Sequence, residues 1–159
     1  MKKFELTAEF VTNVFGKKLF RIKALVAFGN IEKGELGGFI EKEDNLSHAG
    51  NAWVSGNAQV SGNAWVFGNA QVFGNAQVSG DAQVFGNADY AVVAGFGRYF
   101  RTTTFFRCKD KILRVQCGCF YGDLAQFREI VKKTHGDSKY AKEYLAIADL
   151  MELHFSDEC

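Results

Sequence analysis

Residues 50–91 read GNAWVS GNAQVS GNAWVF GNAQVF GNAQVS GDAQVF GNADYA, which is seven hexads of the form G-[N/D]-A-x-[V/Y]-x without a gap. Alanine and valine alternate with variable positions, and this period of two places both side chains on one face of a strand. Each Gly-Asn pair predicts a corner, because these two residue types adopt left-handed backbone conformations at low cost. A helix would need apolar residues at a spacing near 3.6, and the repeated glycine would weaken it. The repeat therefore predicts short inward-facing strands joined by tight turns.

This pattern resembles the hexapeptide repeat of left-handed parallel β-helix proteins. In that family three hexads form one triangular coil of 18 residues, so the resemblance implies that residues 18 apart stack on one face. Two degenerate hexads at 38–49 extend the repeat backwards, with Ile40 and Leu46 at alanine positions and His48 at a valine position. Nine hexads imply about three coils. Each coil contacts only its neighbours, so we expect caps or partners at the two ends.

The segments on either side of the repeats have strand patterns. Residues 3–11 and 19–28 alternate as a half-buried β-hairpin, which we expect to cap one end. Beyond the repeats, residues 99–106 and 112–116 predict a second hairpin.

Two helices are predicted to follow, at residues 124–134 and 139–155, because each has an apolar stripe. Their expected ends are an N-cap at Asp123, a stop near Gly136 and an N-cap at Asp137 or Ser138. The two helices are expected to form a hairpin that packs on the neighbouring strands.

The expected fold is mainly β. An N-terminal β-hairpin cap occupies residues 1–37, a short left-handed parallel β-helix occupies 38–97, and a C-terminal β-hairpin with a two-helix α+β element occupies 98–159.

The composition is that of one compact unit with a net charge of +1 and 47% hydrophobic residues over 159 positions. No apolar run approaches the length of a membrane span, and no signal-type apolar core follows the first residues. We therefore expect a cytoplasmic protein without a membrane partner. The cysteines have neither a disulfide-framework spacing nor a metal-site spacing, so we expect reduced thiols, no metal and no cofactor; they are Cys108, Cys117, Cys119 and Cys159.

The variable positions of the repeats predict a surface. Stacking residues 18 apart gives outward columns of Trp53 on Gln71 and Asp89, of Gln59 on Gln77, and of Trp65 on Gln83. At the next variable position Phe67 stacks on Phe85. Exposed aromatic columns mark interfaces, and the β-helix resemblance implies a homotrimer. The candidate contact residues are Trp65, Phe67, Phe73 and Phe85. The alternative is that the C-terminal helices fold back over this edge.

Positive charge is concentrated after the repeats. Between residues 50 and 97 there is no Lys or Arg, whereas residues 98–114 contain six cations and one acid, Asp110, interleaved with aromatic residues. Guanidinium groups bind phosphates and aromatic rings stack on bases, so this segment predicts a site for a small anionic ligand. A solvated hairpin is the competing interpretation. Long nucleic acid is disfavoured by the overall charge. The candidate ligand-binding residues are Arg98, Tyr99, Arg101, Phe105, Arg107 and Arg114, with Trp65 for stacking and Gln59, Gln77 and Gln83 for polar edges.

Many left-handed β-helix proteins are acyltransferases that bind coenzyme A between subunits and use a histidine base. Here His48 is the only histidine near the repeats, and it has no carboxylate partner that spacing identifies. General-base catalysis requires a positioned base, so we expect no catalytic residue and keep the acyltransferase as an alternative.

A second resemblance covers most of the chain. The segments LFRIKA at 19–24, GELGGFIE at 34–41, CGCF at 117–120 and THGDSKY at 134–140 are similar to those of small phage and prophage repeat proteins. This resemblance implies a role in interfering with host defence. The resulting hypothesis is a non-catalytic, phage-encoded homotrimer that sequesters a nucleotide-like anion. The alternative from another class is a protein-binding inhibitor of a host complex.

Overall fold

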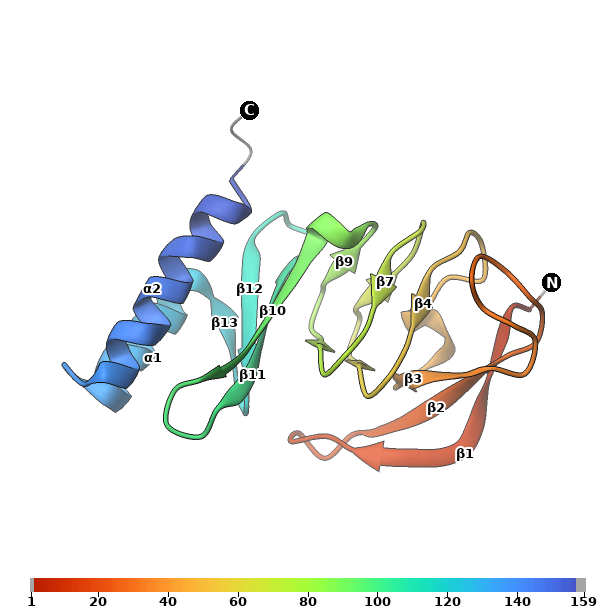
Figure 1. Cartoon of the computed structure of the whole chain (residues 1–159), viewed down its shortest axis with the longest axis horizontal. Coiled ribbons are helices and arrows are strands. Elements are labelled where there is room, and N and C mark those ends of the chain that lie inside the picture. The colour runs from red at the N-terminus through yellow and green to blue at the C-terminus, as the bar shows by residue number, and fades with distance from the viewer. Residues whose placement is uncertain (1, 157–159) are drawn as a thin grey trace.

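The structure, a computed structural model, describes residues 2–156 and is mainly β with two helices at its C-terminal end (Figure 1). The N-terminal elements are β1 (Phe4–Thr12), β2 (Lys18–Ala24), β3 (Leu36–Ile40) and the 3-10 helix η1 (Glu43–Asn45). The repeats contain β4 (Trp53–Val54), β5 (Gln59–Val60), β6 (Trp65–Val66), β7 (Gln71–Val72), β8 (Gln77–Val78), β9 (Gln83–Val84) and the 3-10 helix η2 (Asn87–Asp89). The C-terminal elements are β10 (Tyr90–Phe96), β11 (Arg101–Arg107), β12 (Leu113–Cys117), β13 (Phe120–Asp123), α1 (Leu124–His135) and α2 (Lys139–His154).

The repeat strands pair in parallel at the expected spacing of 18 residues. Strand β4 pairs with β7, β5 with β8, and β6 with β9. The repeat valines and alanines point inward: Val54, Val60, Val66, Val72, Val78 and Val84 are 0% exposed, and the alanines from Ala52 to Ala82 are at most 1% exposed. This confirms the inward alternation.

Glycine alone makes the corners. The repeat glycines from Gly50 to Gly80 have φ between 63° and 69°, and among the described non-glycine residues only Phe100 and Lys111 have positive φ. The expectation that asparagine shares the left-handed position is therefore wrong. Asparagine lies beside the corner in ordinary backbone conformation.

The first layer of the repeats is offset by two residues from the expected register. Ile40 pairs with Val60 and Leu46 bridges to Val66, so both residues continue the valine rows. Their expected alanine positions are wrong, because the segment between Leu46 and Val54 is two residues longer than a hexad. His48 falls in this longer segment, where its ring stacks on Phe4 at 4.2 Å.

The N-terminal hairpin continues a face of the repeats. Strands β1 and β2 pair antiparallel, and the sheet runs in the order β1-β2-β3-β5-β8. Strand β1 lies within one residue of its expected bounds, but β2 ends at Ala24, four residues before its expected end at 28. The lead-in at 36–40 is itself a strand. Trp53, expected to face outward, is 1% exposed because the ring of Phe28 packs edge-on against it at 5.3 Å. This correction removes Trp53 from the exposed columns, and Asp89 lies in η2 rather than in that stack.

A four-stranded antiparallel sheet in the order β10-β11-β12-β13 covers the end of the repeats. The expected hairpin is its centre, β11 and β12, while β10 and β13 were not predicted. The sheet is joined to the last repeats by a hydrogen bond from the Gln77 N–H to the Thr104 hydroxyl at 2.9 Å, and by one from the Lys109 N–H to the Asp81 carbonyl at 2.9 Å. Strand β10 pairs with β11. The expected boundary between the repeat unit (38–97) and the C-terminal unit (98–159) therefore runs between two paired strands of one sheet.

The two helices lie on the far side of this sheet, so repeats, sheet and helices follow one another along the molecule (Figure 1). The expected caps are confirmed: Asp123 accepts from the Gln126 N–H, Gly136 ends α1, and Ser138 caps α2. Phe127, Val131, Tyr144 and Ala148 pack with Phe105 and Val115 of the sheet. The helices therefore cover the sheet and not the aromatic column of the repeats.

Neither helix in residues 2–156 combines the length and apolar character needed to cross a bilayer. The described cysteines Cys108, Cys117 and Cys119 are free thiols, and Cys159 lies outside the described residues. No group of three metal-ligating side chains occurs within the described part of the chain.

Candidate functional site

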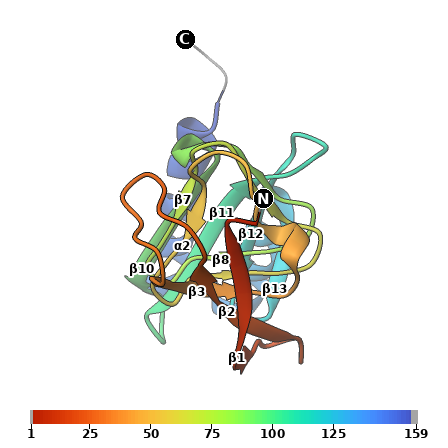
Figure 2. The ribbon, with the colours of Figure 1, turned by 90° about the vertical axis from the view of Figure 1, so that its right-hand side faces the viewer.

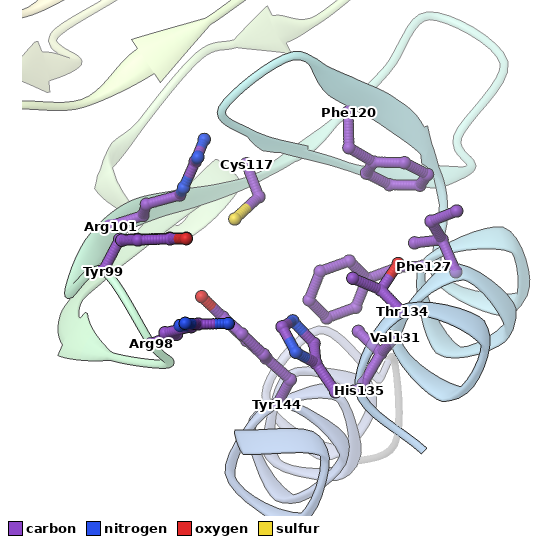
Figure 3. Close-up of a pocket in the computed structure, with 11 residues that line it drawn as sticks. Arg98, Tyr99, Arg101, Cys117, Phe120, Phe127, Val131, Thr134, His135 and Tyr144 are labelled. Atoms are coloured by element: carbon purple, nitrogen blue, oxygen red, sulfur yellow. The ribbon is translucent and has the colours of Figure 1, made fainter. Parts of the chain in front are cut away.

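A pocket of about 200 Å³ lies between the β10–β11 turn, the β12–β13 turn and the helical hairpin (Figure 3). Three of the expected ligand-binding residues border it: Arg98, Tyr99 and Arg101. The apolar wall comes from β13 and α1 and is formed by Phe120, Phe127, Ile130 and Val131. The polar wall is formed by Cys117, Thr134, His135 and Tyr144.

Two guanidinium groups flank one aromatic ring at the pocket. The guanidinium carbon of Arg98 lies 5.6 Å from the centre of the Tyr99 ring, and that of Arg101 lies 5.5 Å from it. Within residues 2–156 neither arginine has an ion pair with a carboxylate. All three side chains are exposed. Two cations without acidic partners thus lie beside a stacking surface, an arrangement suited to anions.

The turn that carries these residues is tied to α2. The Gly97 N–H donates to the Glu143 carboxylate at 3.1 Å, and the Tyr144 hydroxyl donates to the Phe96 carbonyl at 3.4 Å. Burial raises the pKa of Tyr144 to about 12. The hydroxyl is therefore protonated at ordinary pH, and its single O–H is directed to the Phe96 carbonyl, so toward the pocket its oxygen is an acceptor.

His135 closes the other end of the pocket. Its ring is stacked on Tyr144 with centroids 5.8 Å apart, and it is edge-on to Tyr140 with centroids 6.2 Å apart. Figure 3 shows its ring directed between Tyr144 and Phe127.

Arg101 occupies space that the β12–β13 turn leaves open. Gly118 has φ +59°, and a Cβ added there would lie 2.1 Å from a guanidinium nitrogen of Arg101. The absence of a side chain at this turn therefore lets the guanidinium lie across it. The Thr103 hydroxyl donates to the Cys117 sulfur at 3.3 Å on the same side.

The structure separates the other basic candidates from this pocket. Arg114 forms a bidentate pair with Asp110, with both N–O distances 2.9 Å. Arg107 lies 3.5 Å from Asp89 and donates to the Phe155 carbonyl at 3.2 Å. Both arginines stabilise local structure. Their expected place in one phosphate site with Arg98 and Arg101 is wrong, because they lie at the far end of the β11–β12 hairpin.

Phe105 is also corrected. It is 0% exposed and packs edge-on against Phe127 at 6.0 Å. It supports the pocket wall from behind and does not reach a ligand.

The candidates from the repeats lie on other faces. Gln59 lies opposite Gln77 in the β5–β8 strand pair. The Gln77 side-chain oxygen accepts a hydrogen bond from the Gln116 amide at 3.1 Å. Gln83 lies opposite Trp65 in the separate β6–β9 sheet. None of these four residues borders the pocket.

The sequence did not single out the other pocket residues, which are Cys117, Phe120, Phe127, Ile130, Val131, Thr134, His135 and Tyr144. Phe127 and Tyr144 belong to the predicted helical stripes, but a stripe does not indicate which of its members leave a gap against a sheet. His135 precedes the helix stop at Gly136, which was the one local signal available.

His48 is fixed on both sides. Its Nδ1 accepts the Lys3 backbone N–H at 3.0 Å, and its Nε2 lies 2.8 Å from a Glu43 oxygen. The sequence did not identify this carboxylate partner. Since Nδ1 accepts, Nε2 carries the proton and donates to Glu43. Neither nitrogen is left to act on a substrate.

The aromatic column of the repeats is present, with Trp65 and Phe85 exposed and Phe67 half-buried. Trp65 stacks on Phe67 with centroids 3.9 Å apart, and Phe67 lies 5.2 Å from Phe85. Phe85 is 61% exposed. Phe73, which was grouped with them, lies at a different corner, next to Tyr90 at 6.4 Å.

No protein-family model matches this sequence, and a search of curated proteins gives no match.

Proposed function

We propose that the protein is a non-catalytic binding protein that sequesters a small, nucleotide-like anion in the pocket between the β10–β11 turn and the helical hairpin. The main support is that Arg98 and Arg101 flank Tyr99 at this pocket without carboxylate partners in the described residues. An anionic group binds the guanidinium pair, and a planar ring stacks on Tyr99 or enters the apolar part.

The pocket volume limits the ligand. Sites for whole drug-sized ligands are roughly 300–1,000 Å³, and this pocket is about 200 Å³. A single ring system fits the space bounded by Phe120, Phe127 and Val131, and the charged group stays at the exposed arginines. This arrangement favours a mononucleotide-sized unit over long nucleic acid.

The proposal also covers the fold of the repeats, the origin of the protein and its oligomeric state. The repeat segment is a short left-handed parallel β-helix, supported by parallel pairs 18 residues apart and by the buried valine rows. The protein is phage-encoded, acts in the host cytoplasm and forms a homotrimer through the Trp65, Phe67 and Phe85 column. The exposure of the Trp65 and Phe85 rings supports the trimer.

Isothermal titration calorimetry with AMP, ADP and a cyclic dinucleotide tests the binding proposal. We expect at least one of these ligands to bind. Combining Arg98→Ala with Arg101→Ala is expected to weaken its binding by roughly a hundredfold or more, since each of the two charge-assisted contacts contributes about 1.5–3 kcal/mol. Lys109→Gln is the matched control, because it removes a positive charge from an exposed position outside the pocket. Absence of binding by all three ligands, or equal losses in both variants, rejects the proposal.

A protein-binding inhibitor is the second candidate, favoured by the exposed aromatic column of the repeats. Capture of one host complex by the native protein, lost in Phe85→Asp and kept in the double arginine variant, would favour it. The acyltransferase alternative has no supporting observation, since both His48 nitrogens are engaged. Turnover of acetyl-coenzyme A with an amine, abolished by His48→Ala, would establish that alternative.

A further inference from the structure

Strand β10 is an edge strand whose outer side is open. It ends the four-stranded sheet and pairs only with β11, through the register from Tyr90 opposite Phe106 to Phe96 opposite Arg101. Among the described residues, no backbone group from Ala91 to Gly95 has a hydrogen-bond partner outside the β10–β11 pair. An open edge of this kind is a template for another strand.

Two other edge strands, β1 and β13, are better protected than β10. Strand β1 carries Glu5 and Glu9 and has a register shift between Leu6 and Phe10. Strand β13 has four residues and leads directly into α1. Strand β10 reads YAVVAGF, with no charge and no proline. Charges, irregularities and short length are the usual protections of edges. Strand β10 shares the irregularity, with a register shift between Val93 and Phe96, but it is seven residues long and carries no charge.

A hollow lies beside this edge on the side of the repeats. It has a volume of about 370 Å³ and is bordered by Phe73, Asn75, Asn87, Tyr90 and Val92. Phe73 is 60% exposed and Val92 is 37% exposed. An incoming strand directs alternate side chains to this face, so the hollow receives one bulky side chain of that strand.

We propose that β10 binds an extended, uncharged peptide segment of a partner protein by strand addition, with an apolar side chain of that segment seated between Phe73 and Val92. Only extended backbone satisfies a row of open N–H and C=O groups. An uncharged segment is required because a charge placed against Val92 and Phe73 would lose its hydration without a partner.

A single strand is favoured over a second copy of this chain. Figure 2 places the loop between β2 and β3 on the same side of the molecule as β10, and this loop projects outward there. Two copies paired through β10 would bring these loops together. A narrow segment meets no such obstacle.

The probe is a fluorescent nine-residue peptide with alternating Thr and Val around a central Phe and lysine only at its ends. The control peptide has proline at both valine positions and so loses backbone donors. We expect the first peptide to bind, to slow amide hydrogen exchange at residues 91–95, and to bind at least about tenfold more tightly than the control peptide.

Two protein variants locate the binding. Val92→Lys places a charge on the open edge at a partly exposed position and is expected to weaken peptide binding about tenfold or more. Ala8→Lys adds the same charge to the exposed edge of β1 and is expected to leave binding unchanged. Circular dichroism and thermal unfolding confirm that both variants are folded.

Absence of peptide binding, unchanged exchange at 91–95, or equal effects of Val92→Lys and Ala8→Lys would overturn the proposal. Concentration-dependent dimerisation of the native protein that Val92→Lys abolishes would also overturn it, because a second copy would then occupy the edge. The result is independent of the anion pocket, since neither variant alters a residue that borders it.

Discussion

The Tyr144 hydroxyl donates a hydrogen bond to the Phe96 carbonyl at 3.4 Å and so joins helix α2 to the turn that carries Arg98 and Tyr99. The next residue, Gly97, donates its N–H to Glu143 at 3.1 Å. Binding at the proposed anion site therefore depends on the position of α2 as well as on the arginines.

Gly97→Ala is expected to disturb this turn more than Gly95→Ala. Gly97 has φ +81°, and a Cβ there would lie 2.1 Å from the Tyr144 hydroxyl; Gly95 has φ +93° with no atom within 4 Å of a Cβ. Both variants pay the left-handed backbone cost of about 1 kcal/mol. The additional clash makes Gly97→Ala the less stable by urea denaturation, with weaker ligand binding. Equal stabilities of the two variants would contradict the contact with Tyr144.

Val78→Ala is expected to lower the free energy of unfolding by roughly 1–3 kcal/mol, because it removes buried methyl groups and leaves a cavity. Val78 is 0% exposed and lies next to Val60 in the β5–β8 pair. Phe73→Ala changes a ring that is 60% exposed and serves as the control, with a change within about 0.5 kcal/mol. Urea denaturation measures both. A larger loss of stability for Phe73→Ala than for Val78→Ala would contradict the placement of Val78 in the buried core.

Phe85→Asp is expected to convert the proposed trimer to monomers, since a charge would enter an apolar contact. Sedimentation velocity of the native protein and the variant measures this change. Phe73→Asp, at a different corner, is the matched comparison and is expected to remain trimeric. A monomeric native protein rejects the trimer, and dissociation by Phe73→Asp would extend the interface to that corner.

The buried Lys3 makes the free energy of unfolding rise with pH. Its ammonium group donates to the Ala52 carbonyl at 2.6 Å and lies 4.6 Å from the Phe28 ring centre, yet burial lowers its pKa from 10.5 to about 8. Between these two values the unfolded chain binds more protons at this position than the folded chain, so the contribution to the free energy of unfolding rises with pH. Below about pH 8 both states are protonated and the contribution is constant.

Lys3→Met removes this contribution. Urea denaturation at several pH values is expected to show the native protein gaining stability relative to Lys3→Met as the pH rises through 8–10.5. Lys23→Met, at an exposed position in the same hairpin, is expected to keep the native pH dependence. A gap between native protein and Lys3→Met that stays constant with pH would show that the buried amine remains charged.

The local patterns predicted much of the fold. The hexads predicted the buried valine and alanine rows and the 18-residue pairing, because a period of six repeats the same inward side chains at every turn. The helices and their caps at Asp123, Gly136 and Ser138 followed from short-range chemistry. The failures lie elsewhere: β10 and β13 were not predicted although Gly97 and Gly118 lie in the turns beside them, and the register at Ile40 depended on a two-residue lengthening after Leu46.

The candidate site, too, was predicted only in part. The sequence identified Arg98, Tyr99 and Arg101 as a basic and aromatic group, because the three residues are neighbours in the chain. It did not separate them from Arg107 and Arg114, whose partners Asp89 and Asp110 are shown only by the folded hairpin. The walls of the pocket come from strands and helices distant in the chain.

What the sequence by itself determined is therefore the repeat with its inward valines, the two C-terminal helices and the position of unbalanced positive charge. All three depend on residues within a few positions of one another. Only the tertiary structure decided that Trp53 and Phe105 are buried, that His48 is held between Lys3 and Glu43, and that β10 is left as an open edge. The physical reason is that burial and pairing are set by whichever distant segment packs against a residue.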